Sequence, residues 1–254
     1  VYLYVFSDIN ITSQITVPRE KALHIYAVKD VTLTKGFATT NSLIALNENA
    51  GLTIQTLGAG SLEIDGYQTN YSSSSYANGH LIWGSTGTQV YMYEGVMLYG
   101  NYCTDGGAGS AIYLMSGSVT FRGGKILDCF QKNSSSYGRV IYIGGSSGSF
   151  SMYNCTYESF SSMEISAATV TISNSMIHGV GTIVDTGGNT YSLKISDSYF
   201  NANNVNSSSS SAIKLNRSRN YTISNCQFVN RCITATTSVT SLTLSSCYFV
   251  NTTT

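Results

Sequence analysis

The chain has 254 residues, with 13 Lys+Arg against 13 Asp+Glu, so its formal net charge is zero and charged residues make up 10% of it. This balance excludes a nucleic-acid-binding protein, which needs a basic face to displace counterions. The 42% of apolar residues argues against a disordered chain, and no apolar stretch reaches the roughly 18 residues of a membrane span. The abundance of Ser (39), Thr (28), Asn (20) and Tyr (19), with one proline, is typical of secreted β proteins.

The first 60 residues contain short runs in which apolar and polar residues alternate, a pattern that predicts strands. These runs lie at 4–6, 11–15, 23–25, 31–33 and 52–54. Their spacing is less regular than that of the later strands. We interpret residues 1–60 as the less regular first coils of one domain that covers residues 1–254 and becomes regular from residue 61 onward.

From residue 62 onward one pattern recurs: apolar, polar, apolar, any residue, a turn-forming residue at the fifth position, and an apolar residue at the eighth. Its copies lie at 96–103, 119–126, 150–157, 170–177, 193–200, 221–228 and 242–249, and 62–69 is a looser copy. Gly, Asn and Asp tolerate the left-handed backbone of a sharp bend, so we predict two strands joined by a corner in each copy. The predicted corner residues are Gly66, Gly100, Gly123, Asn154, Asn174, Asp197, Asn225 and Ser246.

A third apolar run precedes each copy, which gives every repeat three short strands. These runs lie at 43–46, 81–83, 111–114, 140–143, 163–165, 182–184, 212–215 and 232–235. Three strands in a coil of about 20–30 residues predict an all-β, right-handed parallel β-helix of about ten coils, stacked about 4.8 Å apart. The alternative, an antiparallel sandwich, does not account for the repeated three-strand register.

The repeat resembles that of the pectin-lyase-like parallel β-helix superfamily, most closely its adhesins and polymorphic outer-membrane proteins. The resemblance is carried by the opening segments 8–12 and 31–36, by Gly106–Ile112 with Gly117–Gly124, and by Phe200–Asn203. It implies a surface-exposed adhesive or structural protein, located outside the cell or at its surface.

Enzymes of this fold are usually polysaccharide hydrolases, which need clustered carboxylates, or lyases, which need a base and often carboxylate-bound calcium. In the predicted register the seven Asp and six Glu do not gather on one face. His178, within Ile177–Gly179, is interpreted as a surface residue. We therefore predict no catalytic residue, no metal site and no cofactor.

Asparagine-linked glycosylation is a further expectation, because the chain has eight N-x-S/T sequons where its composition predicts about five. We expect the loop residues Asn70, Asn133 and Asn206 to be the best acceptors, and Asn154, which is also a corner residue, to be the worst. The remaining sequons are at Asn10, Asn216, Asn220 and Asn251.

The six cysteines include one candidate disulfide. Cys226 and Cys247 occupy the same inward position of successive repeats, 21 residues apart, and the strand spacing lies within the range that a disulfide spans. Two buried free thiols, acting as small apolar residues, fit the pattern as well. The sequence leaves both readings open.

The predicted function is a non-enzymatic, extracellular structural or adhesive β-solenoid. A solenoid end exposes unpaired strands and core, and neither end of the sequence shows an amphipathic helix. Copies of the chain stacked end to end into a fibre are therefore one expected partner, and glycans or cell-surface ligands are another, whereas nucleic acid and a membrane span are not expected.

Two alternatives remain. The first is a carbohydrate-binding or polysaccharide-cleaving β-helix, with ligand contacts at the Ser-rich insertions 71–76, 133–137 and 203–211. The second is an ice-binding solenoid that uses the outward residues Thr120, Thr171, Thr222 and Thr243, in a row interrupted by Lys194, Met97 and Glu63.

Overall fold

The computed structural model describes twelve parts of the chain: residues 1–37, 40–67, 79–103, 109–133, 136–137, 139–159, 162–180, 184–186, 192–203, 211–216, 220–235 and 239–251. For residues 131–133, 136–137, 180 and 202–203 it describes the backbone alone. Within these parts the chain is all-β and contains no helix.

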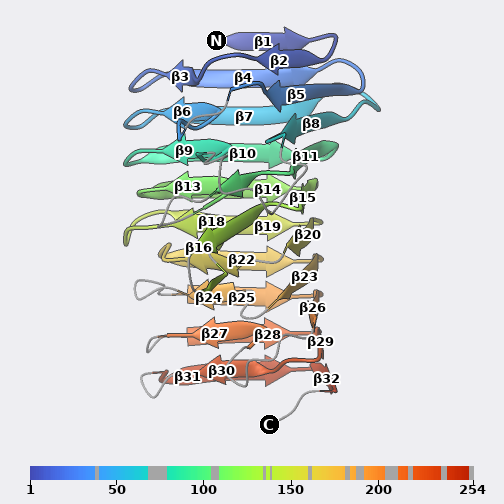
Figure 1. Ribbon diagram of the computed structural model, residues 1–254. Helices are drawn as coiled ribbons and strands as arrows, with labels where there is room; N and C mark the ends of the chain where they lie inside the picture. The colour runs from blue at the N-terminus through green and yellow to red at the C-terminus, as the bar shows by residue number, and fades with distance from the viewer. Residues whose placement is uncertain are drawn as a thin grey trace.

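Three long parallel sheets wrap around one core, and each sheet takes one strand from nearly every coil (Figure 1). In this view sheet A lies at the front, sheet B at the right and sheet C at the left, and the coils descend from the N-terminus to the C-terminus. Strands stack in chain order, ten in sheet A, ten in sheet B and nine in sheet C. The predicted parallel β-solenoid of about ten three-stranded coils is confirmed.

Sheet A consists of β1 (Tyr2–Val5), β4 (Ala22–Ala27), β7 (Gly51–Thr56), β10 (Thr88–Tyr93), β14 (Gly117–Arg122), β19 (Ser149–Tyr153), β22 (Thr169–Ser173), β25 (Ser192–Ser196), β28 (Asn220–Ser224) and β31 (Ser241–Ser245). Sheet B consists of β2 (Ile9–Ile11), β5 (Val31–Lys35), β8 (Leu62–Asp65), β11 (Val96–Tyr99), β15 (Lys125–Leu127), β20 (Thr156–Ser159), β23 (Met176–Val180), β26 (Tyr199–Asn203), β29 (Gln227–Val229) and β32 (Tyr248–Val250). Sheet C consists of β3 (Ile15–Val17), β6 (Ile44–Leu46), β9 (Ile82–Gly84), β13 (Ile112–Leu114), β18 (Arg139–Ile143), β21 (Ser162–Ile165), β24 (Val184–Thr186), β27 (Ile213–Leu215) and β30 (Ile233–Ala235). A small extra sheet joins β12 (Tyr102–Cys103), β16 (Phe130–Asn133) and β17 (Ser136–Tyr137).

The alternating sequence pattern forms the core because every second side chain of a strand points inward. Equivalent inward residues stack on one another from coil to coil, so each column buries what no single coil could bury. In sheet B, for example, Phe200, Phe228 and Phe249 form a continuous column with successive ring centroids 5.1 Å apart. The remaining side chains of each strand point outward, and together they form the three outer faces of the solenoid.

Sheets A and B meet at a sharp corner, and the backbone there explains the turn-forming residues of the repeat. Among non-glycine residues at this corner, φ lies between 48° and 57° in the last five coils, at Asn154, Asn174, Asp197, Asn225 and Ser246. In the coil before these, Gly123 has φ 89°. These six residues therefore lie where the pattern predicts a left-handed bend.

Gly66 and Gly100 are placed differently from the prediction, and their assignment to this corner is corrected. Both follow strands of sheet B, β8 and β11, and therefore lie at the corner between sheets B and C. Gly100 has φ 60°, but Gly66 is not in the left-handed region. At Gly66 a Cβ would lie 2.6 Å from the Cα of Asn101, so close backbone approach requires the glycine. The apolar–polar pattern recurs at both corners, and the pattern alone does not distinguish them.

Candidate functional site

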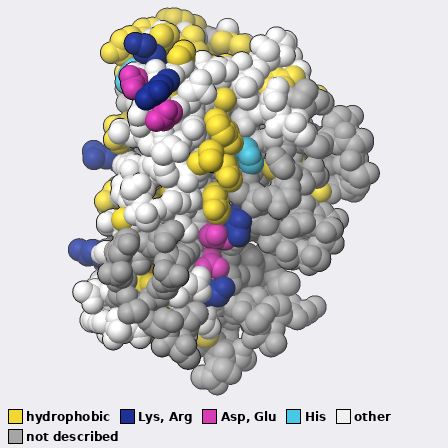
Figure 2. Space-filling model, turned by 90° about the vertical axis from the view of Figure 1, so that its left-hand side faces the viewer, with side chains coloured by type: hydrophobic (Ala, Val, Ile, Leu, Met, Phe, Trp, Pro, Cys, Tyr) yellow, Lys and Arg dark blue, Asp and Glu magenta, His cyan; other side chains and the backbone are white. Residues whose placement is uncertain are grey.

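The outer face of sheet C carries a continuous row of large and charged side chains. The strand register places one outward residue from each coil in the row, which we call the sheet C strip: Trp83, Tyr113, Tyr142, Glu164, Asp185 and Lys214. Figure 2 views this face and shows hydrophobic side chains in a column, a histidine beside it, and acidic and basic side chains at its lower end. The strip thus changes from aromatic to charged along the solenoid axis.

The aromatic half of the strip is held together by ring stacking. Tyr113 stacks on His80 with ring centroids 5.0 Å apart, and on Tyr142 at 5.1 Å. The guanidinium of Arg139 lies 5.1 Å from the Tyr142 ring centroid, in cation–π geometry. Nδ1 of His80 lies 2.8 Å from the carbonyl oxygen of Gly109, which fixes the imidazole. Because neighbouring rings cover one another, Tyr113 and Tyr142 are each half-buried.

The charged half consists of two ion pairs, with the two carboxylates next to each other. Arg139 forms an ion pair with Glu164, and Lys214 Nζ lies 3.3 Å from Asp185 Oδ2. The side-chain amide of Asn216 donates to the Asp185 carboxylate and to the carbonyl oxygen of Thr186. Burial is the main influence on Glu164 and raises its pKa, the neighbouring carboxylate of Asp185 raises it further, and the Arg139 guanidinium opposes both.

The strip can form hydrogen bonds to a long ligand at regular intervals. Successive coils lie about 4.8 Å apart, so the five steps from Trp83 to Lys214 span about 24 Å by that spacing. Tyrosine hydroxyls both donate and accept, carboxylate oxygens accept, and Arg and Lys donate. A hydroxyl-rich chain laid parallel to the solenoid axis would meet such a group at every coil.

Sequence reasoning missed the strip, although its signal is present in the third apolar run of each repeat. Alternation in 111–114, 140–143 and 212–215 places Tyr113, Tyr142 and Lys214 at equivalent outward positions. The inward residues of these runs define the strand, whereas the strip emerges only when the outward residues of successive coils are aligned.

The carboxylates as a whole do not gather on one face, since Glu164 and Asp185 lie on sheet C, but four others share sheet B. Glu63, Asp65, Asp128 and Glu158 all belong to the outer face of sheet B or its edge. Burial is the largest cause of raised pKa values at Glu63, Asp65 and Asp128, and a neighbouring carboxylate adds to it at Glu63 and at Asp128. Glu158 pairs in register with His178, whose Nε2 is buried and accepts or donates no hydrogen bond within the described structure. Chain order separates these residues by up to 95 positions, and only the coil register brings them together.

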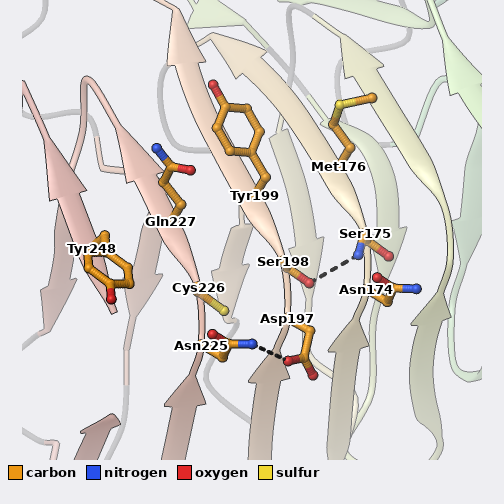
Figure 3. A pocket seen from close by; sticks show the side chains of 10 residues that line it. All are labelled: Asn174, Ser175, Met176, Asp197, Ser198, Tyr199, Asn225, Cys226, Gln227 and Tyr248. Atoms are coloured by element: carbon orange, nitrogen blue, oxygen red, sulfur yellow. Dashed lines mark hydrogen bonds between the residues drawn. The ribbon is translucent and has the colours of Figure 1, made fainter. Parts of the chain in front are cut away.

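The corner between sheets A and B bears a shallow polar hollow of about 470 Å³ (Figure 3). On its outer side, Asn174 donates its amide to Asn154 at 2.6 Å, and Asn225 donates to Asp197 at 2.6 Å. These bonds link neighbouring coils at the left-handed corner residues. We interpret the row as a structural element, because its polar groups already satisfy one another.

The sequons fall into distinct environments. Asn70 and Asn206 lie outside the described residues, and the side chain of Asn133 does too. Asn10, Asn154, Asn220 and Asn251 are exposed, and Asn154 is engaged by Asn174. Asn216 is half-buried and its amide is committed to Asp185 and Thr186. Glycosylation at any of these asparagines stays a prediction.

Cys226 and Cys247 lie in adjacent coils at equivalent positions, and both are free thiols in the structure. Cys226 is buried, and Cys247 is half-buried in the last coil. The Cys226 thiol donates to the carbonyl oxygen of Ser224 at 3.1 Å, and the Cys247 thiol lies 3.4 Å from that of Ser245. A disulfide between the two thiols stays a candidate.

The threonine row belongs to sheet A. There Thr120, Thr171, Thr222 and Thr243 share one outward position, with Ser151 and Lys194 between them. Met97 and Glu63, which were expected to interrupt it, lie in sheet B instead. Ice binding by this row stays a prediction.

At the last coil, the inward residues Leu244 and Phe249 are 45% and 42% exposed. End-to-end association of copies likewise stays a prediction. In the described part of the chain, no three His, Cys, Asp or Glu side chains are grouped to hold a metal ion. The same residues include no helix long and apolar enough to cross a membrane.

Comparison of the chain with protein-family models, with curated proteins and with solved structures gave no match.

Proposed function

We propose that this chain is an extracellular adhesive β-solenoid that binds a linear polysaccharide along the sheet C strip. The observation that carries the proposal is the uninterrupted contact from His80 through Tyr113, Tyr142 and Arg139 to Glu164. These contacts pre-organise the side chains, so little conformational entropy is lost when a ligand binds. The resemblance of the repeat to adhesins agrees with an adhesive role.

A carbohydrate fits the strip better than an apolar ligand does. Tyrosine side chains lie in one half of it and charged groups in the other, and saccharide hydroxyls can donate to carboxylates and accept from Arg, Lys and tyrosine hydroxyls. An apolar peptide segment would instead need a desolvated hydrophobic centre, which interfaces usually have.

The test measures calorimetric binding of cello-, xylo- and galacto-oligosaccharides from two to eight units long. We expect affinity to rise with length until the oligosaccharide spans the strip and then to level off. The double variant Tyr113→Ala/Tyr142→Ala should bind at least about tenfold more weakly. The matched control is Tyr91→Ala, which removes a half-buried outward tyrosine from sheet A.

Equal losses in the two variants, or no binding to any of these sugars, would reject the proposal. Binding of unstructured peptides at the strip, with none of sugars, would instead assign the face to a protein partner.

Cleavage of the bound polysaccharide is a second candidate function, and the placement of two carboxylates favours it. Glu164 and Asp185 are register partners on adjacent strands and their carboxylates interact, and retaining glycosidases act through two neighbouring carboxyl groups. Glu164, with its raised pKa, suits the acid that protonates the leaving oxygen. Asp185, paired with Lys214, suits the nucleophile that forms the glycosyl ester, which water then hydrolyses with Glu164 as base.

Release of reducing ends from the bound polysaccharides tests this candidate. Glu164→Gln should abolish release even at polysaccharide concentrations that saturate the strip. Binding without any release by the wild-type chain would reject cleavage and leave the adhesive function in place.

A further inference from the structure

A second feature lies across the core from sheet C, at the corner between sheets A and B where β14 ends and β15 begins. Arg122 is the last residue of β14 and Lys125 the first of β15. Both side chains are exposed, and neither belongs to any ion pair among the described residues. In a chain with so few charges, two cations without an acidic partner stand three positions apart on opposite sides of one corner.

Two glycines keep the space between the cations open. Gly123 and Gly124 have φ 89° and 93°, conformations that other residues adopt only with strain. A Cβ on Gly124 would lie 2.6 Å from the carbonyl oxygen of Val96, and one on Gly123 would lie 2.9 Å from the Cβ of Glu94. The corner therefore sits tightly against the preceding coil, and no side chain fills the gap between Arg122 and Lys125.

The surface around this corner is hollowed. One hollow of about 490 Å³ contains Lys125 and Arg122, and another of about 500 Å³ contains Tyr93 and Arg122. Both are lined by Arg122, Glu94 and Gly95, so they form one groove with Arg122 at its middle. Each half has the size of a small-molecule site.

The charges of the groove select a ligand that is anionic at one point and hydroxylated at another. Arg122 can donate two parallel hydrogen bonds to a carboxylate or sulfate, and Lys125 adds a second positive charge. Glu94 repels a bare anion, but its carboxylate accepts hydrogen bonds from hydroxyl groups. A sugar that carries an acid group satisfies all three residues.

We propose that this groove, which we call the Arg122 groove, is a second binding site that takes the acid group of a uronate or sulfated saccharide. It is independent of the sheet C strip, because it uses other sheets and other residues. One chain could then bind two glycan segments, which would strengthen attachment to a polysaccharide matrix through multivalency.

The test compares binding of polygalacturonate oligosaccharides, heparin oligosaccharides and uncharged galactan oligosaccharides of equal length. We expect the wild type to bind at least one acidic series, and Arg122→Gln/Lys125→Gln to weaken it at least about tenfold. The matched control is Lys194→Gln, which neutralises an exposed lysine on the face of sheet A. Polygalacturonate and heparin separate a carboxylate ligand from a sulfate ligand.

The variant Glu94→Gln tests separately whether the Glu94 carboxylate accepts a hydrogen bond from a sugar hydroxyl. If Glu94 accepts a sugar hydroxyl, this variant should bind inorganic sulfate more tightly and the acidic saccharide more weakly. Equal losses in the Lys194→Gln control would show diffuse electrostatic attraction and overturn the proposal, as would a wild type that binds no acidic sugar. Retained binding of a neutral oligosaccharide at the sheet C strip confirms that the variants are folded, and loss of that site alone would not affect this proposal.

Discussion

The hydroxyl of Ser198 accepts a hydrogen bond from the backbone N–H of Ser175 in the preceding coil, with N and Oγ 3.2 Å apart (Figure 3). The same hydroxyl donates to the carbonyl oxygen of Ser196 in its own coil at 2.7 Å. Ser175 repeats both interactions, because it accepts from the N–H of Cys155 and donates to Ser173. A column of small inward residues thus replaces, at the corner, the backbone hydrogen bonds that the strands make elsewhere.

Removing one member of this column should destabilise the fold. Ser198→Ala leaves the buried N–H of Ser175 without an acceptor, which we expect to lower the free energy of unfolding by about 1–3 kcal/mol. Urea denaturation followed by circular dichroism measures the change. The control is Ser192→Ala, at an exposed position of β25. Equal effects of the two substitutions would contradict this role of the hydroxyl.

At Asn174, where φ is 48°, the left-handed backbone predicts that glycine is tolerated better than valine. A β-branched side chain is strained in this conformation, so Asn174→Val should lower the free energy of unfolding by about 1–3 kcal/mol. Asn174→Gly should cost less, although it also loses the amide bond to Asn154. Thermal unfolding ranks the two variants. A valine variant as stable as the glycine variant would show that backbone strain is negligible there.

The acidic face of sheet B predicts a pH dependence of stability. The pKa values of Glu63 and Asp128 are raised, mainly by burial. The folded state therefore binds protons more tightly than the unfolded state between the ordinary and the raised pKa. The contribution of these two groups to the free energy of unfolding falls as the pH rises through the raised pKa and recovers on acidification.

Replacing the two carboxylates by neutral amides should remove this loss of stability at neutral pH. We expect Glu63→Gln/Asp128→Asn to be more stable than the wild type at pH 7, and the difference to shrink toward pH 4. Urea denaturation across that range measures it, with Glu48→Gln, which removes the exposed partner of Arg19, as control. A difference that is independent of pH would contradict the assignment.

Burial of three cysteines predicts that they react slowly with thiol reagents. Burial raises the pKa of Cys129 to about 12, and those of Cys155 and Cys226 to about 11. Because the thiolate is the reactive form, these three should react with Ellman's reagent at pH 8 at least about tenfold more slowly than the half-buried Cys232 and Cys247. Time-resolved labelling of single Cys→Ser variants assigns each rate.

The same reagent tests the candidate disulfide between Cys226 and Cys247. Denatured protein that has never met a reductant should release six thiol equivalents if all cysteines are free, as in the structure. Four equivalents that rise to six when reductant is added to the wild type, with four in the Cys226→Ser/Cys247→Ser variant both with and without reductant, would show that Cys226 and Cys247 are joined.

Much of the fold could be predicted from the sequence, because the information lies within single coils. Alternation at 242–249 or 221–228 sets which side chains face inward, and Asn225 or Asn174 marks the bend. The two misplaced corner residues show the limit of this reasoning. Gly66 and Gly100 follow an alternating strand just as Gly123 does, and the local pattern is the same at both corners.

The amino-acid sequence alone specifies the coil: its three strands, its inward residues and most of its bends, since these follow from period-2 alternation and from the few residues that tolerate positive φ. Which outward residues become neighbours depends instead on how the coils stack. Tyr113 and Tyr142 are 29 positions apart and Glu164 and Asp185 are 21 apart, yet each pair lies on adjacent strands. Loops of unequal length between strands set that register, and pairing of whole coils through backbone hydrogen bonds then places the sheet C strip and the Arg122 groove on opposite sides of one core.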